Sequence, residues 1–489
     1  MNRTRKPASA KRRSGIAGSD GGGVRSLAGS GRAIGGLGAC AIAVALLLTP
    51  RTAQAVPSYA RQTGMKCTVC HQAFQQLTPF GRWFKLNGYV YGDATDLPPL
   101  SGMLQGAPGY TITGKDQPGG AAPYFNANNN WSVNQISAFY AGRLMGPYAK
   151  YILGDSAAAA VNHVGTFIQG TWDGVEQGGP SWDNAEIRAA DSVDFHGTTI
   201  TYGAYVNNNP TMSDLWNTTP VWGYPFSSSS LAPAPVAAPL IAGGVGQQVA
   251  GYGAYMMVAD MLYTEFALYQ SLSPQFQGFF GVNPEGETQL KDVAPYWRIA
   301  LYKQMGAANG EIGTFGLTSG TYPGRDHSAG WDRITDVGAD SQLQYLTDLH
   351  SVTVLLNTIY EWENWNASKQ LGLADNPHDH LLTTSAVLSY LYDSTYGFDV
   401  QYFYNVGSSD AALYGTRTGS PRTDGWNFEA DWLPFNKNGG PSFWPYSNVK
   451  LDVQYTVYNN FDGSRNNFNG EGRNAPDNNT VYIEAWIMF

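Results

Sequence analysis

From residue 100 onward, apolar residues alternate with polar or small residues in segments that loops rich in Gly, Asn, Asp and Pro separate. In the last segment, 481–489, every odd position is apolar and Glu484 lies on the other face. Segments 450–458 and 398–406 repeat the pattern, with Lys450 and Asp399 among the residues of their polar faces. An alternation with period two is typical of a β-strand that has one apolar and one polar face.

The alternation predicts sixteen strands. Their expected ranges are 101–113, 132–145, 161–172, 184–193, 197–207, 251–261, 262–271, 296–305, 311–322, 340–348, 350–363, 380–393, 396–406, 425–434, 447–459 and 479–489. The number is even, as in single-chain bacterial barrels, and long and short connections mostly alternate. Connections 146–160 and 435–446 are longer than the short turns expected there, and the Ser/Pro/Ala-rich stretch 227–239 is predicted to be disordered.

The predicted fold class is therefore all-β, with residues 100–489 forming a 16-stranded antiparallel outer-membrane barrel. A soluble sandwich would give the same alternation. Aromatic residues near strand ends favour the membrane barrel, because Trp and Tyr concentrate at the two membrane interfaces. Examples are Trp172, Trp362, Trp426 and Trp432. Outer-membrane lipid is the expected surrounding of such a barrel.

The N-terminus has the form of a signal peptide, predicted over residues 1–55. A long basic region precedes the apolar run 39–48, and Ala53-Gln54-Ala55 has the small-x-small form of a cleavage site. The mature chain is expected to begin at Val56. Removing the nine basic residues and one acidic residue of the leader takes the net charge from −9 to −17. Bulk charge thus excludes nucleic-acid binding, and it favours attraction of cations.

The mature chain keeps two cysteines, and both belong to the run Cys67-Thr68-Val69-Cys70-His71. In this spacing two thiols add to the two vinyl groups of one haem, and the adjacent imidazole becomes the proximal iron ligand. A disulfide or half of a zinc site are the other interpretations, but no further cysteine remains to complete a zinc site. The motif predicts a single covalently attached haem c on Cys67, Cys70 and His71.

Residues 56–99 form the predicted mono-haem c-type cytochrome domain. With 44 residues, this domain is too small to bury a sufficient core alone, so it is expected to plug the barrel lumen. Arg82 and Lys85 are predicted to bind the haem propionates. The alternative is that both are solvated residues on a short packed helix, and this alternative weighs more for Lys85.

Four interpretations of the sixth haem ligand stay open. The alternation in 101–113 directs Met103 into the lumen, and a thioether ligand raises the reduction potential. Met103 is therefore the leading candidate for the distal iron ligand. His163 also faces the lumen, whereas Met65 lies only two residues before Cys67. The fourth possibility is that no protein ligand binds there.

Pro57 to Arg61, the haem motif and Leu77 to Tyr89, followed by a barrel, resemble the fused outer-membrane cytochrome-porin family of bacterial Fe(II)-oxidising c-type cytochromes. The resemblance is sharpest over residues 57–113. It implies an iron oxidase that takes one electron from extracellular Fe(II). It also implies that the haem passes electrons to a periplasmic cytochrome or copper protein.

The Fe(II) site itself is not predicted. Hard oxygen donors suit Fe(II), and Glu361, Glu363, Glu429 and Asp431 are expected to face the lumen, with His378-Asp379-His380 at an outer loop. Each of these residues is more simply interpreted as hydrating a lumen or a loop. Two other functions stay open: a diffusion porin with a haem plug, and an outward conduit that reduces extracellular metal.

Overall fold

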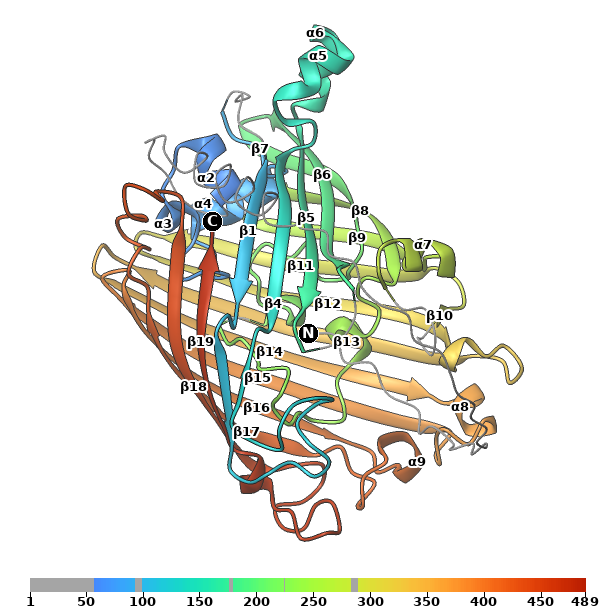
Figure 1. Ribbon diagram of the computed structural model, residues 1–489. Helices are drawn as coiled ribbons and strands as arrows, with labels where there is room; N and C mark the ends of the chain where they lie inside the picture. Colours follow the sequence, from blue (N-terminus) through green and yellow to red (C-terminus); the bar gives the residue numbers. More distant parts are fainter. Residues whose placement is uncertain (1–56, 93–98, 176–178, 224, 283–288) are drawn as a thin grey trace, which may run out of the picture.

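The computed structural model describes residues 57–92, 99–175, 179–223, 225–282 and 289–489. The predicted signal peptide and Val56 lie outside these ranges. The described chain forms one closed antiparallel barrel with short helices near both of its ends (Figure 1). Its strands are β1 (Leu100–Gln105), β2 (Gly109–Thr113), β3 (Asn130–Ser132), β4 (Gln135–Arg143), β5 (Val164–Asp173), β6 (Ser181–Phe195), β7 (Thr198–Asn207), β8 (Val249–Val258), β9 (Leu262–Ser271), β10 (Gln289–Leu290), β11 (Ala294–Met305), β12 (Ala308–Tyr322), β13 (Asp332–Leu346), β14 (His350–Asn364), β15 (His378–Tyr392), β16 (Tyr396–Gly407), β17 (Thr423–Trp432), β18 (Asn448–Asn460) and β19 (Thr480–Met488).

The barrel closes because β1 pairs with both β4 and β19. In the register, Met103 lies opposite Met488 on one side and Ser137 on the other. Two predicted strands are each interrupted in the structure. The predicted strand 101–113 corresponds to β1 and β2, and the predicted strand 132–145 corresponds to β3 and β4. The short β10 pairs with the end of β12 and adds no further strand to the wall. Within the described residues, sixteen strands therefore close the wall, which confirms the predicted barrel.

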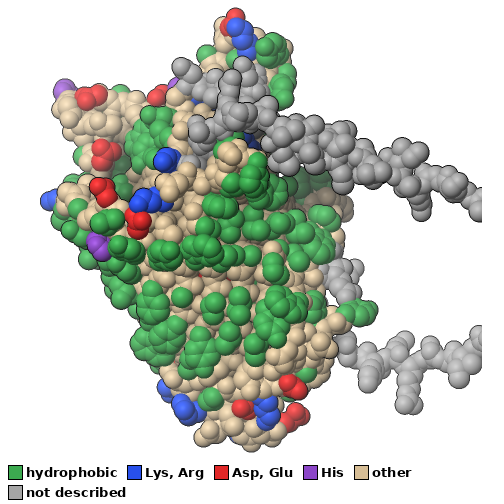
Figure 2. Space-filling model, turned by 60° about the vertical axis from the view of Figure 1, so that its left-hand side comes forward, with side chains coloured by type: hydrophobic (Ala, Val, Ile, Leu, Met, Phe, Trp, Pro, Cys, Tyr) green, Lys and Arg blue, Asp and Glu red, His purple; other side chains and the backbone are tan. Residues whose placement is uncertain are grey.

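The outer surface of the barrel is apolar over its middle. Large exposed hydrophobic side chains on the strands include Tyr202, Tyr252, Phe266, Ile299, Leu301, Ile312, Leu343, Leu356, Leu388, Phe398, Phe428, Val453 and Ile483. Figure 2 shows hydrophobic side chains in a broad band, with charged side chains nearer its two ends. Trp172, Trp362, Trp426 and Trp432 are exposed near strand ends, as predicted. A closed barrel without free edges and with an apolar exterior is the form in which strands cross lipid, and the protein is located in the bacterial outer membrane.

The two ends of the barrel differ. The links after β6, β8, β11, β13 and β15 are tight turns at one end, and the links after β7, β9, β14, β16 and β18 are long. Short turns face the periplasm in bacterial barrels. The C-terminus and helices α2 to α4 lie at this short-turn end (Figure 1). No helix within the described ranges is long and apolar enough to cross a bilayer.

One strand boundary was predicted wrongly. β13 begins at Asp332, eight residues before the predicted start at 340. The early part of this strand carries buried aspartates on its inward face and Arg333 and Thr335 on its outward face. Because this part of the strand has polar residues on both faces, the alternation of apolar and polar positions that predicts a strand is missing there.

The stretch 227–239 was also predicted wrongly, because it is ordered inside the barrel. It belongs to the segment 208–248 between β7 and β8, here called the inward loop, whose described residues are mostly buried. The loop contains η2 (Pro220–Trp222) and η3 (Leu240–Gly244). It contacts the wall on several sides, since Trp216 O accepts from Gln342, Ser227 donates to Glu484, and Pro233 O accepts from Tyr458.

Residues 57–92, here called the helical segment, lie within the short-turn end of the barrel. They contain α2 (Pro57–Thr63), α3 (Cys67–Cys70) and α4 (Pro79–Leu86). Tyr59, Phe74, Phe84 and Tyr89 share a buried cluster with residues of β1, β4, β15 and β19. The remaining helices lie in connections: η1 (Gly146–Tyr148), α5 (Ala149–Leu153), α6 (Asp155–Val161), α7 (Pro274–Phe279), η4 (Pro323–Arg325), α8 (Asn366–Gln370), α9 (Ala411–Tyr414) and η5 (Ala475–Asn478).

The two connections that are longer than expected lie at the same end as the helical segment. The first contains α5 and α6, which project away from the barrel (Figure 1). The second, 433–447, covers the helical segment, because Asn436 donates to Gln72 O and Arg61 lies over the Tyr446 ring. Both connections that are not short turns thus lie at the end of the barrel that holds the helical segment.

Candidate functional site

The motif from Cys67 to His71 is held by two short helices that pack backbone to backbone. Thr78 caps α4 by accepting a hydrogen bond from Gly81 N at 3.1 Å, and Pro79 occupies the first turn. A Cβ at Gly81 would lie 2.1 Å from Cys70 O. Only glycine allows α4 to approach α3 so closely, and this contact fixes Cys70 within the lumen.

The donor set formed by α3 and His71, which directly follows it, fits a c-type haem. Cys67 and Cys70 are free, buried thiols on one helical turn, and burial raises the pKa of each to about 12. Burial also lowers the pKa of His71 to about 4, so its imidazole is neutral, the form that binds metal. His71 Nδ1 is buried and has no hydrogen-bond partner within the described residues.

The three candidate sixth ligands lie in different surroundings. Met103 is buried, as its predicted lumen orientation requires, and it belongs to the same cluster as Ala73 and Phe74, which follow His71 closely in the chain. His163 lines an open cavity of about 330 Å³ together with Trp83 and other residues, and none of the haem motif lines that cavity. Met65 is partly buried beside α3. The ligand assignment stays a prediction.

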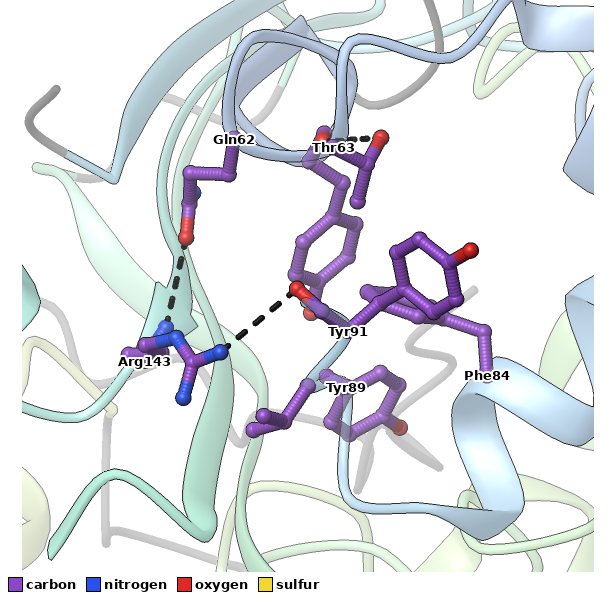
Figure 3. Close-up of a pocket in the computed structure, with 8 residues that line it drawn as sticks. Gln62, Thr63, Phe84, Tyr89, Tyr91 and Arg143 are labelled. Atoms are coloured by element: carbon purple, nitrogen blue, oxygen red, sulfur yellow. Dashed lines mark hydrogen bonds between the residues drawn. The ribbon is translucent and has the colours of Figure 1, made fainter. Parts of the chain in front are cut away.

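The helical segment meets the wall tightly on the β4 side. Figure 3 shows the cavity between α2, the chain after α4 and Arg143 of β4. Its volume is about 10 Å³, which is roughly the space of one water molecule. Gln62 accepts from Arg143 N at 3.4 Å, and the Arg143 guanidinium donates to Tyr91 O at 3.5 Å. This interface therefore anchors the segment and leaves no room for a larger ligand.

Arg82 is bound to the opposite wall. Its guanidinium donates to Gln342, Gln344 and Asn309 at 2.7 Å each. It also lies over the Tyr302 ring, and burial lowers its pKa. These contacts anchor α4 to β11, β12 and β13, and propionate binding by Arg82 stays a prediction.

Lys85 joins the helical segment to the inward loop. Its ammonium donates to Met212 O at 2.8 Å, Asp214 O at 2.5 Å and Asn217 Oδ1 at 3.3 Å. Burial, with a smaller contribution from Arg188, lowers its pKa to about 7. The alternative that Lys85 is solvated is wrong, because the side chain is buried. Its propionate role stays a prediction.

Two buried arginines on the wall complete the attachment, and sequence reasoning missed both. Arg188 pairs with Glu186 at 2.8 Å and donates to Lys85 O and Ser213 O, so it holds both the helical segment and the inward loop. Arg298 pairs with Asp214 of the inward loop at 3.2 Å. Burial alone would raise the pKa of Asp214, but Arg298, Lys85 and backbone N–H donors lower it.

The predicted lumen carboxylates are inward and buried, but they do not form one site. Near the outer end of β14, Glu361 accepts from Leu240 N of the inward loop at 2.6 Å, and Glu363 is also buried. Glu429 and Asp431 lie near the other end, on β17. His378 and His380 bind Asn364 and Ser408 respectively and lie in no group of three metal-ligating residues within the described ranges.

No family model matches the sequence, and no curated protein matches it. Among solved structures the chain is similar to OmpT, an outer membrane protein of Vibrio cholerae, with 10% identity and a TM-score of 0.40 over 80% of this chain and 98% of that chain. It is also similar to the outer membrane channel DcaP of Acinetobacter baumannii, with 10% identity and a TM-score of 0.42 over 82% and 100%. The anion-selective porin from Comamonas acidovorans gives 9% identity and a TM-score of 0.39 over 80% and 98%. These similarities concern the barrel and assign no activity to this chain.

Proposed function

We propose that the protein carries electrons across the outer membrane through a single c-type haem, and that extracellular Fe(II) is the electron donor. The observation that carries the proposal is the Cys67-Thr68-Val69-Cys70-His71 run, whose first four residues form α3 and which lies inside the barrel wall. The choice of Fe(II) rests on the resemblance of residues 57–113 to the cytochrome-porin family. A periplasmic cytochrome or copper protein is the proposed acceptor, since the helical segment lies at the short-turn end.

The residues divide into attachment and positioning roles. Cys67 and Cys70 would hold the haem covalently and His71 would bind its iron, which supplies a one-electron carrier when bound. Arg82 and Lys85 fix α4 to the wall and to the inward loop. Because these contacts are buried, they hold the motif in one place and limit the access of water. An electron carrier needs no acid-base pair, and we assign none.

The first test is reduction of the purified, oxidised holoprotein by Fe(II). In a stopped-flow instrument, Fe(II) should produce the absorbance change of haem reduction in one fast phase whose rate increases with Fe(II) concentration. Mn(II) carries the same charge but does not reduce haem, so it is the control and should cause no change. If Fe(II) fails to reduce the haem at every pH at which the barrel stays folded, the iron-oxidase function is wrong.

The second test concerns Met103. If its thioether binds the iron, Met103→Leu should remove the sulfur-to-iron charge-transfer band and lower the midpoint potential by on the order of 0.1 V. Met488 is a matched control because it lies directly opposite Met103 in the register. Met488→Leu should change neither quantity. An unchanged band and potential in Met103→Leu would transfer the assignment to His163, Met65 or an open position.

A diffusion porin with a haem plug is the second candidate. It is supported by the sixteen-strand barrel, a size that leaves an aqueous interior in porins. The two segments inside this barrel count against a free channel, since the helical segment and the inward loop are joined by Lys85 and by Arg188. Conductance distinguishes the two functions.

A further inference from the structure

Buried aromatic rings, here called the aromatic series, follow the lumen from the helical segment toward the outer end of the barrel. All belong to one buried cluster, and each is at most 4% exposed. The members are Tyr205 on β7, Tyr255 on β8, Tyr263 and Tyr269 on β9, and Tyr296 on β11. Tyr263 and Tyr269 are six residues apart, which corresponds to roughly 20 Å along a strand. The series therefore extends along most of β9.

The inner end of the aromatic series contacts the helical segment. The Tyr255 phenol donates to the carbonyl of Leu86, the last residue of α4, at 2.6 Å. Arg188 also joins the two, because its guanidinium lies 5.7 Å from the centre of the Tyr89 ring and 4.9 Å from that of Tyr255. Since α4 packs directly on Cys70, the first ring of the series lies one helix away from the haem-attachment motif.

Neighbouring rings of the series are in contact. The ring centres are 6.4 Å apart for Tyr205 and Tyr255, 6.0 Å for Tyr255 and Tyr263, and 6.2 Å for Tyr269 and Tyr296. These separations lie within the range of paired aromatic side chains. The phenols of Tyr205 and Tyr269 are also joined by a hydrogen bond. The contacts thus run without a break from the short-turn end of β9 to its outer part.

The barrel wall is shaped around three of these rings by glycines. Each glycine faces one ring, and a Cβ at any of the three positions would overlap that ring. The pairs are Gly203 with Tyr255, Gly253 with Tyr205 and Gly251 with Tyr269. Glycine inside a strand weakens the strand and marks a position that another group approaches closely. Two neighbouring strands, β7 and β8, therefore give up side chains where the rings lie.

A second group of aromatic rings lies in the long link after β9, at the outer end of the barrel. Trp182, at the start of β6, stacks on Phe280 with ring centres 4.4 Å apart. Phe279 of α7 (Figure 1) lies 5.0 Å from Phe280 and is 81% exposed. An aromatic group therefore extends from the wall to the outer surface.

Two asparagines connect the aromatic series to this outer group. Tyr269 donates to Asn207 Oδ1 at 2.9 Å, and the next residue, Asn208, donates to Asp183 O at 2.5 Å. Asp183 directly follows Trp182 in the chain. A continuous path of ring contacts, hydrogen bonds and covalent bonds thus leads from the outer surface to α4.

We propose that Tyr269, Tyr205 and Tyr255 form the route by which an electron crosses the lumen from the outer face to the haem. The proposal rests on the proposed function, in which the donor is extracellular and the helical segment lies at the short-turn end. Because the helical segment and the inward loop are bound to the wall and to each other, a donor outside does not reach the motif by diffusion. The electron must therefore pass through the protein.

The transfer balances without any proton. Extracellular Fe(II) loses one electron and becomes Fe(III), and the ferric haem iron gains that electron and becomes ferrous. The rings provide close contact along the path and store neither the electron nor a proton. Their phenols keep their hydrogen bonds, such as the one that Tyr263 donates to Glu265 at 3.1 Å.

The test measures electron transfer inside the full-length holoprotein in detergent, without Fe(II). Gly278 on α7 is exposed and a Cβ there meets nothing within 4 Å, so Gly278→Cys can carry a ruthenium tris-bipyridyl maleimide. The other thiols of the holoprotein are in thioether bonds and do not react. A laser flash, with an aromatic amine as sacrificial donor, converts the label to ruthenium(I), which then gives its electron to the ferric haem. The rise of ferrous-haem absorbance gives the rate.

Loss of one ring should slow this transfer. Tyr205→Leu should lower the rate by at least about tenfold, because it opens a gap between ring contacts. Tyr205→Phe keeps the ring and loses the hydrogen bond to Glu265, so its rate should stay within about twofold of the wild type. Phe315→Leu is the matched control and should keep the wild-type rate. Phe315 is also a fully buried ring against a glycine, Gly338, but it pairs with no aromatic ring within the described residues.

Heat-modifiable electrophoretic mobility reports whether each variant is folded, and the haem midpoint potential reports whether the driving force is unchanged. If Tyr205→Leu does not fold, Tyr269→Leu gives the same comparison. Equal rates in the wild type and in a folded leucine variant of the series, or equal slowing in Phe315→Leu, overturn the route. Because the flash needs no Fe(II), a ring-dependent rate in a holoprotein that Fe(II) does not reduce contradicts only the proposed donor. Ring-independent transfer in a holoprotein that Fe(II) does reduce contradicts only the route.

Discussion

Cys67→Ser and Cys70→Ser should each weaken covalent haem attachment, and the double variant should abolish it. The thioether bonds of a c-type haem survive denaturation, whereas a haem held only by an iron ligand is lost. The measurement is peroxidase-type haem staining of the full-length protein after denaturing electrophoresis. The wild type should stain at the position of the polypeptide, and the double variant should show no stain.

The chain supplies its own controls for this experiment. Cys40→Ser changes the third cysteine, which lies in the predicted signal peptide, and should leave staining at the wild-type level. His71→Ala keeps both thiols, so it should retain covalent stain while the absorption spectrum of the iron changes. An unstained wild type, produced in cells that attach haem to other c-type cytochromes, would show that the motif is not a haem site.

The barrel could be predicted because its signal is local. Alternation with period two depends on each strand having one face toward lipid and one toward the lumen, and this condition holds along most of the wall. It failed at the start of β13, where Asp332 and Asp336 face inward and the outward face is also polar. The parity that placed Met103 in the lumen is confirmed by its burial, because side-chain direction on a strand follows directly from position.

The inward loop could not be predicted for a different reason. A stretch rich in Ser, Pro and Ala has the composition of a disordered linker, but inside a barrel its backbone groups bind polar side chains of the wall. Pro233 O and Ala237 O, for example, accept hydrogen bonds from Tyr458 and Asn405. Those partners are more than ninety residues away in the chain, so the composition of 227–239 does not indicate them.

Only part of the candidate site could be predicted from the sequence. Cys67, Cys70 and His71 lie within five residues of one another in the sequence, so their chemistry could be predicted without knowing the fold. The partners of Arg82 and Lys85 lie on β11 to β13 and in the inward loop, more than a hundred residues later in the chain. Similarly, Tyr205, Tyr255 and Tyr269 are brought together only by the register of β7, β8 and β9. Contacts between residues on different strands cannot be predicted until the strand pairing is known.

A second large effect is expected in electrical recordings from planar bilayers. The wild type should give no resolvable channel openings, because the helical segment and the inward loop occupy the lumen and are bound to the wall and to each other. Deleting residues 57–92 should produce discrete openings, and also replacing 208–248 by a short turn should enlarge them, because a sixteen-strand barrel without contents encloses an aqueous channel. The same variants should lose covalent haem, so the two measurements can be compared in one preparation.

The control for these deletions is removal of 149–161, which contains α5 and α6. These helices lie at the same end of the barrel but project away from it, so their loss should leave the conductance of the wild type unchanged (Figure 1). Folding of each deletion is checked by heat-modifiable mobility before recording. Stable, porin-like openings of the intact wild type would favour the diffusion porin over electron transfer through a sealed barrel, because a protein that conducts ions freely does not isolate its lumen from water. A silent wild type that opens only when the helical segment is removed is the result that a sealed electron carrier requires.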